Sequence, residues 1–408
     1  MVFDVHYRMG HAWMALTRRA FSLGSAGALA AAGLARPAVA DSTPIRFGWL
    51  AALTGANSAP GVGYNRGVLW AVNKINAAGG VNGRKIEVIT RDTQGDPTKA
   101  VNAATEMAAR DKVDAVFGPV NSGESLATTP ILARFKVPNL TVGVVNRLID
   151  PTKYPNAFRL SPSNTQWDDA NRNYCLNVLK AQNIAVLGDN TGYGTTAVGD
   201  SVAAFEKAGA KVVYHDVIDA NAQDTSPDLL RAKNAGADVV VVWSDSTGLD
   251  ARMMNARGRI GWEVVFSGHP AMGSGDVAHL LEKPEYWEKV YIIGYKNCSY
   301  GASGKLPART QAFVDELKGK VELSDTSLWW VAEATDAVNL VAEAVAKTGS
   351  SSSEAITGYW NTLKKWPGMF GDYTFSPTQH NGYPTDEIVM SKANSVRNGA
   401  FTLAPGYG

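Results

Sequence analysis

The sequence predicts an α/β fold built as two successive units, each a mostly parallel sheet flanked by helices. Short apolar runs alternate with segments whose apolar residues recur every three or four positions, first over residues 45–142 and again over residues 166–295. This alternation is typical of strands joined by amphipathic helices, and such connections give right-handed, doubly wound sheets. The most apolar run, Ala237–Trp243 (ADVVVVW), suits the centre of a sheet.

The first unit is predicted to contain four strands and three helices. Apolar residues between Val62 and Ile75 fall on one helix face, and Gly79-Gly80 ends that helix. Asp96-Pro97 places a cap and then a proline at the start of the next helix. Strands are expected at 45–50, 85–91, 115–117 and 139–142, and helices at 62–78, 97–110 and 125–135.

The second unit repeats the pattern, and three helices follow it. Its strands are expected at 184–187, 211–217, 237–243, 264–267 and 290–295, and its helices at 166–179, 195–208, 226–235, 251–257 and 277–281. The later helices are expected at 309–317, 328–347 and 353–364, with strand-like pieces at 373–375 and 387–390.

The first forty residues are predicted to be an export signal rather than part of the fold. Arg18-Arg19 precedes the thirteen-residue apolar run Leu23–Ala35, and Ala38-Val39-Ala40 fits a cleavage site, so the mature chain is expected to start at Asp41. The pattern resembles a twin-arginine signal, which implies export of a folded chain to the periplasm. An alanine-rich helix with a chance arginine pair is the competing interpretation.

Charge and cysteine content exclude several classes of protein. The chain has 408 residues with 39 basic and 38 acidic side chains, a net charge of +1. Residues 1–40 contribute +3, so the remainder carries +1 − 3 = −2. A near-neutral chain has no electrostatic footprint for nucleic acid. Two cysteines exclude a disulfide scaffold; whether Cys175 and Cys298 pair stays open, with separate thiols favoured.

Motifs for catalysis are weak. The mature chain has four scattered histidines, so no metal site is expected. Gly123–Ala127 resembles a nucleophile elbow but lacks its last glycine. Gly192-Tyr193-Gly194-Thr195-Thr196-Ala197 has the outline of a dinucleotide fingerprint, displaced by four residues from the end of the predicted strand. A cofactor-dependent oxidoreductase is therefore kept as the alternative, while no catalytic residue, cofactor or metal is predicted.

Glycine- and polar-rich loops follow most of the predicted strands. In open α/β sheets, ligands bind at the carboxyl ends of the strands, and helix starts there attract anions. Two sheets that present such edges to each other would form a cleft. The loops are 53–55, 118–123, 143–146, 189–194, 244–248 and 268–270.

Several motifs of the sequence resemble those of a known protein family. Ala52-Leu53-Thr54-Gly55, followed by Ile75–Arg84 (INAAGGVNGR), resembles the start of branched-chain-amino-acid-type solute-binding proteins, the extracytoplasmic receptors of ABC importers. The resemblance covers about residues 44–390. Looser matches are Asp92, Asp96-Pro97 with Ala100, Phe117-Gly118-Pro119, Tyr193-Gly194 and Phe375-Ser376.

The resemblance implies a two-lobed Venus-flytrap fold of the periplasmic binding protein-like I type, in which a hinge motion clamps a small-molecule ligand between the lobes. It also implies a monomer that delivers this ligand to an ABC permease, with a sensory module as a further alternative. The chain is expected to cross between lobes near Ser161, Lys296 and Gly382. Lobe one would comprise 44–160 plus 297–381, and lobe two 161–296 plus 382–408.

Ligand contacts carry over from the family residue by residue. Ser122 matches the residue that hydrogen-bonds the ligand carboxylate, Gly143 and Val145 fall where the family uses backbone groups and a threonine, and Tyr193 matches an aromatic of lobe two. The family's second aromatic falls at Thr247. The complete predicted set is Tyr64, Val120, Asn121, Ser122, Gly143, Val145, Asn146, Tyr193, Thr247 and His269.

One departure bears on the ligand. The family's acidic partner for the ligand ammonium should follow Gly268, where His269 and Pro270 stand. Because a buried ammonium needs a negative partner, we expect a ligand without an α-ammonium, an aromatic or aliphatic carboxylate. Asp245 is a second, less favoured candidate for that partner. Aromatic residues expected near the cleft, which would stack on a ring, are Trp49, Tyr64, Tyr193 and Trp329.

Overall fold

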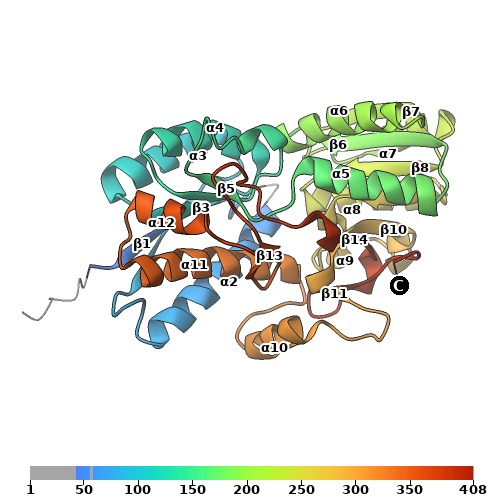
Figure 1. Cartoon of the computed structure of the whole chain (residues 1–408). Helices are drawn as coiled ribbons and strands as arrows, with labels where there is room; N and C mark the ends of the chain where they lie inside the picture. The colour runs from blue at the N-terminus through green and yellow to red at the C-terminus, as the bar shows by residue number, and fades with distance from the viewer. Residues whose placement is uncertain (1–42, 56–57, 408) are drawn as a thin grey trace, which may run out of the picture. The chain divides into compact units, whose positions relative to one another are not determined.

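The computed structural model describes residues 43–55 and 58–407, which form two α/β sheets and their flanking helices (Figure 1). The predicted twin-arginine signal and the cleavage site after Ala40 lie outside the described residues.

The first sheet has five parallel strands in the order β2-β1-β3-β4-β5. Its strands are β1 (Ile45–Ala51), β2 (Ile86–Asp92), β3 (Ala115–Phe117), β4 (Asn139–Thr141) and β5 (Ala157–Arg159). Four of them fall within two residues of their predicted bounds. β5 was not predicted, because its sequence, Ala157-Phe158-Arg159, ends on a charged residue and shows no apolar run; pairing with β4 defines it.

Helices cover both faces of the first sheet. Phe47 and Trp49 pack toward α2 and α11, whereas Leu50 and Val116 pack toward α3 and α4. α2 and α11 lie side by side in Figure 1 and share the most extensive helix–helix contact of the described chain. The helices are α2 (Ser58–Ala77), α3 (Pro97–Glu106), α4 (Ser122–Arg134), α10 (Ala308–Leu317), α11 (Leu328–Thr348) and α12 (Ser353–Trp360).

The second sheet has six strands in the order β14-β10-β9-β8-β6-β7, and only β14 runs antiparallel. β8 lies inside this sheet and all five of its residues are buried, as its apolar sequence predicts. The strands are β6 (Asn183–Asp189), β7 (Lys211–Ile218), β8 (Val239–Trp243), β9 (Val265–Gly268), β10 (Val290–Tyr295) and β14 (Ile388–Lys392). The helices are α5 (Asn164–Asn173), α6 (Gly192–Lys207), α7 (Ser226–Asn234), α8 (Thr247–Arg259) and α9 (Val277–Leu280).

Two small ladders complete the fold. β11 (Ser299–Tyr300) pairs with β15 (Phe401–Thr402), and β12 (Trp366–Pro367) pairs with β13 (Asp372–Tyr373). The chain passes from the first sheet to the second between β5 and β6, and it enters the second sheet again at β14, after α11 and α12 have packed with the first. The exact lobe boundaries stay a prediction.

Four helices begin three or four residues earlier than predicted, and all four follow strands of the two sheets; α2 was expected to start at 62. α4, α6 and α8 were expected to start at 125, 195 and 251. Their first turns contain glycine and therefore resemble loops in sequence. Side chains of Asn121, Thr191 and Ser246 accept amide hydrogens in those first turns, so the helices are capped at the earlier positions.

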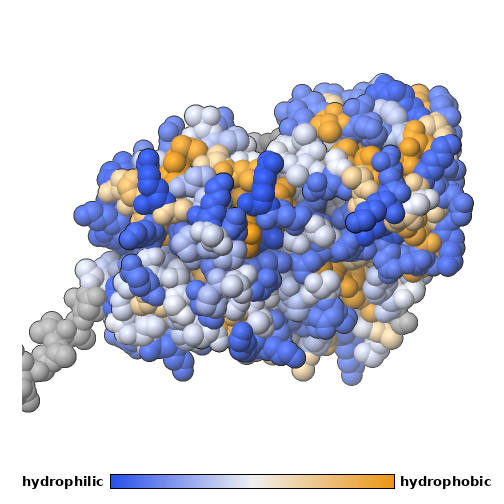
Figure 2. All heavy atoms as spheres, turned by 45° about the horizontal axis from the view of Figure 1, so that its top comes forward, coloured by the Kyte–Doolittle hydropathy of each residue, from blue (hydrophilic) through white to orange (hydrophobic). Residues whose placement is uncertain are grey.

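Cys175 and Cys298 are both buried and carry free thiols. No helix within the described ranges is both long enough and apolar enough to cross a membrane. On the face shown in Figure 2, hydrophilic residues predominate and apolar residues form small, separate patches.

Candidate functional site

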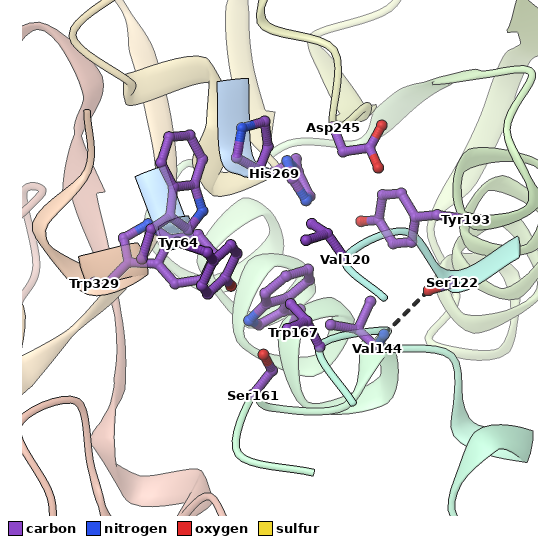
Figure 3. Close-up of a pocket in the computed structure, with 13 residues that line it drawn as sticks. Tyr64, Val120, Ser122, Val144, Ser161, Trp167, Tyr193, Asp245, His269 and Trp329 are labelled. Carbon is purple, nitrogen blue, oxygen red and sulfur yellow. Dashed lines mark hydrogen bonds between the residues drawn. The ribbon is translucent and has the colours of Figure 1, made fainter. Parts of the chain in front are cut away.

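A pocket lies between the strand ends of the two sheets and receives residues from both (Figure 3). The cavity volume is about 40 Å³, below the range of small-molecule sites, about 300–1,000 Å³. The walls are formed by Pro60, Tyr64, Val120, Ser122, Val142, Val144, Ser161, Trp167, Tyr193, Asp245, His269, Trp329 and Trp330.

The first turn of α4 forms one end of the pocket. Ser122 is the first residue of this helix, and the hydroxyl oxygen of Ser122 accepts a hydrogen bond from the Val144 amide at 3.1 Å. Its hydroxyl hydrogen is thus directed to another acceptor. A helix start also leaves backbone N–H groups unpaired and carries partial positive charge. This end of the pocket suits a carboxylate.

An aromatic wall from α2 and α11 forms the opposite side (Figure 3). Tyr64 and Trp329 meet edge to face with ring centroids 6.0 Å apart, and both are buried. The indole nitrogen of Trp329 has no acceptor within the described part of the chain. Flat rings and one unpaired N–H group therefore face a ligand here.

A buried glutamate supports this wall from behind. Glu333 of α11 accepts hydrogen bonds from Ser161 at 2.6 Å and from the Tyr64 hydroxyl at 3.0 Å. Burial raises the pKa of Glu333 to about 8, and the two hydroxyl donors oppose that rise. Glu333 therefore holds a proton at neutral pH and fixes two pocket residues without adding a charge.

Residues of the second sheet supply further hydrogen-bond donors. The Nδ1 atom of His269 accepts from the Ala271 amide at 3.2 Å, and burial lowers the pKa of His269 to about 3. The ring is therefore neutral with its proton on Nε2. Tyr193 packs 5.1 Å from His269 between centroids, and its hydroxyl, unpaired among the described residues, points toward the middle of the pocket (Figure 3).

Asp245 is the acidic residue of the pocket wall. It follows β8, and its Oδ2 atom accepts a hydrogen bond from Nδ2 of Asn121 at 2.6 Å. Asn121 precedes α4 of the first sheet, so this bond links the lobe of the first sheet to the lobe of the second. Burial, together with the neighbouring Asp189, raises the pKa of Asp245 well above its usual range.

The starts of α4 and α6 touch at the mouth of the pocket. A Cβ atom built on Gly192 would lie 2.6 Å from the Cα atom of Gly123, closer than such atoms approach in proteins. Neither glycine has a left-handed backbone. Gly192 therefore requires glycine for the close approach of the two helix starts rather than for local conformation, whereas a Cβ atom on Gly123 would make a tight contact at 3.3 Å from Gly192.

Five of the ten predicted site residues line the pocket: Tyr64, Val120, Ser122, Tyr193 and His269. Whether they bind a ligand stays a prediction.

The other five predicted residues lie around the pocket rather than in its walls. Val142 and Val144 line the pocket, whereas Gly143 and Val145 do not, because side chains of an extended segment alternate. The carbonyl groups of Gly143 and Val145 accept from Arg159.

Asn121 reaches Asp245 from beside the pocket. Asn146 is exposed and donates to Thr165 at 2.6 Å, and Thr247 donates to Asp276 at 2.7 Å. Of the four aromatics expected near a ligand, Trp49 is the one that lies outside the walls; it stacks on Phe117 in the core.

Sequence reasoning missed Ser161 and Trp167 as wall residues. Ser161 was marked only as a lobe crossing, and Trp167 lies in the first turn of α5, just after that crossing. The signal that could have found them is their position, since a segment that crosses between lobes must pass the pocket.

The dinucleotide alternative is not supported by the geometry at α6. β6 extends to Asp189, so two residues rather than four separate it from Gly192. However, the Asp189 side chain accepts a hydrogen bond from the Thr191 amide at 3.0 Å, and Gly123 of α4 packs against Gly192. The space over this helix start, where a pyrophosphate would lie, is occupied. No three acidic, histidine or cysteine side chains of the described residues are grouped to hold a metal ion.

Comparisons with known proteins agree with this geometry. The chain is 30% identical over 208 residues to a Pseudomonas aeruginosa protein named amino acid binding protein, of which it covers 55%. It is 26% identical to Leu/Ile/Val-binding protein homolog 3 of Brucella melitensis, with 90% of this chain and 95% of the relative covered. The match to the first relative thus spans about half of that protein's length.

Solved structures share the fold. A periplasmic binding protein type 1 from Bordetella pertussis superposes with a TM-score of 0.77 at 23% identity, over 89% of this chain and all of the other. The branched-chain amino acid transporter substrate-binding protein LivJ of Streptococcus pneumoniae, solved with isoleucine, gives a TM-score of 0.75 at 23% identity, over 88% and 97%. The fold is therefore the two-lobed one that the resemblance implied.

The sequence family described as periplasmic binding protein matches residues 44–395, which is most of the chain. With a pocket between two α/β lobes and a family match of this extent, the chain belongs to the periplasmic binding proteins.

Proposed function

We propose that this chain is the substrate-binding receptor of an ABC importer and that it captures a small carboxylate-bearing solute, an aromatic or aliphatic acid, between its lobes. It performs no catalysis itself. The lobes comprise residues 44–160 plus 297–381 and residues 161–296 plus 382–408. They close by a hinge at the crossings near Ser161, Lys296 and Gly382.

The observation that carries this proposal is the set of hydrogen-bond donors in the pocket. The Ser122 hydroxyl, the Tyr193 hydroxyl, the His269 Nε2–H and the Trp329 indole N–H all belong to wall residues. The Tyr193 hydroxyl and the Trp329 indole nitrogen have no partner among the described residues. A buried donor without a partner costs about 1–3 kcal/mol, so a ligand with acceptor atoms gains by pairing with them. A carboxylate between aromatic walls meets that requirement.

The alternative ligand class is an α-amino acid, and one observation favours it. Asp245 lies in the pocket wall, where a carboxylate would pair with an ammonium. The names of the relatives, amino acid binding protein and Leu/Ile/Val-binding protein homolog, point the same way. We rank the acid first because Asp245 is buried beside Asp189 and holds its proton, which leaves no charge for an ammonium.

Isothermal titration calorimetry tests the ligand class. The purified chain is titrated with benzoate, with 3-methylbutanoate and with leucine at pH 7. We expect binding of at least one acid and weaker binding of leucine. Tight leucine binding would reverse the ranking but keep the receptor function, whereas a failure of both classes in a broad thermal-shift screen would count against the receptor itself.

Location and partners complete the proposal. We propose that residues 1–40 direct the folded chain to the periplasm and are removed after Ala40. The mature receptor acts as a monomer and hands its ligand to the membrane subunits of the importer. The amino-terminal sequence of the protein recovered from the periplasm tests the cleavage site, with Asp41 expected as the first residue.

A further inference from the structure

We infer that Asp245 determines which ligands the pocket admits, a carboxylate rather than an ammonium, because Asn121 holds its carboxyl group against the ligand space and a second buried carboxyl group, that of Asp189, lies against it. This inference rests on the proposed function and concerns the same pocket.

The orientation of Asn121 is fixed by two hydrogen bonds. Its Oδ1 atom accepts from the Gly123 amide at 2.8 Å, so its Nδ2 group must face the other way, and it donates to Asp245 at 2.6 Å. Asn121 belongs to the lobe of the first sheet and Asp245 to that of the second. The bond therefore forms only when the lobes are together, at the moment when the ligand is enclosed.

The neighbour Asp189 lies against Asp245 and is held by three donors. Its carboxyl group accepts from the Asp245 amide at 3.0 Å, from the Thr191 amide at 3.0 Å and from the Thr191 hydroxyl. Because two adjacent carboxyl groups do not both ionise readily, Asp189 raises the pKa of Asp245.

Other groups around Asp245 act in the same direction. Asp250 of α8 is fully buried, and it too raises the pKa of Asp245. Tyr193 of α6 and His269 after β9 face the pocket in neutral form. The Asn121 amide favours the ionised form, but burial and Asp189 raise the pKa of Asp245 more strongly.

The protonation state decides which ligands fit. An uncharged carboxyl group can donate its O–H to a ligand acceptor, whereas an ionised one would repel a carboxylate in a site of low dielectric constant. An ammonium ligand would first have to expel the proton of Asp245. The pocket thus favours anionic ligands, and this preference weakens when the pH rises far enough to ionise Asp245.

The decisive variant is Asp245→Asn, which keeps an acceptor for Asn121 and is uncharged at every pH. Benzoate and leucine are titrated into both proteins between pH 6 and pH 9. We expect benzoate to lose affinity for the natural chain as the pH rises. Its affinity for Asp245→Asn should stay within about threefold, because asparagine does not titrate. The exposed Asp169→Asn, on α5 and outside the pocket, serves as the matched control and should behave like the natural chain.

A second variant makes the reverse prediction. Asp189→Asn removes the neighbouring charge, so Asp245 should ionise at lower pH and benzoate should bind more weakly at pH 8 than it binds the natural chain. Loss of leucine binding by about 100-fold or more in Asp245→Asn would overturn the inference, because Asp245 would then be the ionised partner of an ammonium. That result would leave the receptor function intact.

A ligand-free measurement decides the matter if neither probe binds. Asp245 keeps its proton in the folded chain but ionises in the unfolded chain above about pH 4. The natural chain should therefore lose thermal stability relative to Asp245→Asn as the pH rises from 5 to 8. An unchanged difference in Tm across that range would refute an uncharged Asp245, and failure of every ligand in the same experiments would count separately against the receptor function.

Discussion

The contact between Gly123 and Gly192 predicts that closure of the lobes can be weakened without harm to the fold. The substitution is Gly192→Ala. Its Cβ atom would lie 2.6 Å from the Gly123 Cα atom and 3.2 Å from the Gly123 nitrogen when the lobes are together. Both atoms belong to backbone at a helix start, so they cannot move aside as a flexible side chain would.

The magnitude follows from the two states of the receptor. Overpacking by one methyl group costs about 1–3 kcal/mol where the surroundings cannot relax. That cost applies only to the closed form, so ligand affinity should fall about 5- to 150-fold. In the open form the new methyl group is unhindered, and alanine favours a helix over glycine by about 0.5–1 kcal/mol. The Tm without ligand should therefore stay the same or rise slightly.

The assay is calorimetry with the tightest binder of the acid and amino-acid screen, beside the Tm of the ligand-free protein. Gly199→Ala is the matched control, because it lies in the same helix and its Cβ atom would meet nothing within 4 Å. Its affinity should equal that of the natural chain. Equal affinity in Gly192→Ala would refute the reasoning, because the glycine contact would then play no part in the bound state.

Three further predictions concern single side chains of the site. Ser122→Ala should weaken carboxylate binding by about 10- to 150-fold in calorimetry, the loss expected for a hydrogen bond of about 1.5–3 kcal/mol to a charged group; an unchanged affinity would place the carboxylate elsewhere. Glu333 has a folded pKa of about 8, above its usual 4.5, so the natural chain should lose stability as the pH rises from about 5 to 8, and Glu333→Gln should flatten that slope in thermal unfolding. His269 has a folded pKa of about 3, below its usual 6.5, so stability should fall as the pH drops from 6.5 toward 3; His269→Asn should be less acid-sensitive, and a parallel loss in both proteins would contradict a neutral, buried ring.

Much of the fold could be predicted from the sequence because each sheet strand of useful length carries its own signal. β8 is five buried residues of valine and tryptophan, and such a run has few alternatives to a central strand. β5 was missed although the equally short β3 and β4 were predicted, since its sequence ends on Arg159 and no apolar run marks it; its pairing with β4 identifies it as a strand. The periodicity of a segment indicates which of its own residues are buried. A short strand at the edge of a sheet is instead defined by its pairing with the neighbouring strand.

The helix starts at the pocket were harder to predict for a reason tied to their role. Gly123 and Gly192 lower helix propensity and made the first turns of α4 and α6 read as loops. The structure shows that these same glycines let the two lobes approach. Glycines at the contact between the lobes thus weaken the local helix signal. The secondary-structure prediction therefore fails at the positions where the two lobes meet.

The wall residues of the pocket follow the same logic. The rule that ligands bind at strand ends led to the loop after β8, but it could not distinguish Ser244, Asp245 and Thr247 within that loop. What singles out Asp245 is its hydrogen bond to Asn121, 124 residues earlier and on the other lobe. The chemical state of Asp245 depends on Asp189, at the end of a different strand. Specificity in this chain is therefore a property of the closed arrangement of two lobes, and a change at any one of these three positions should alter the effect of the other two on ligand choice.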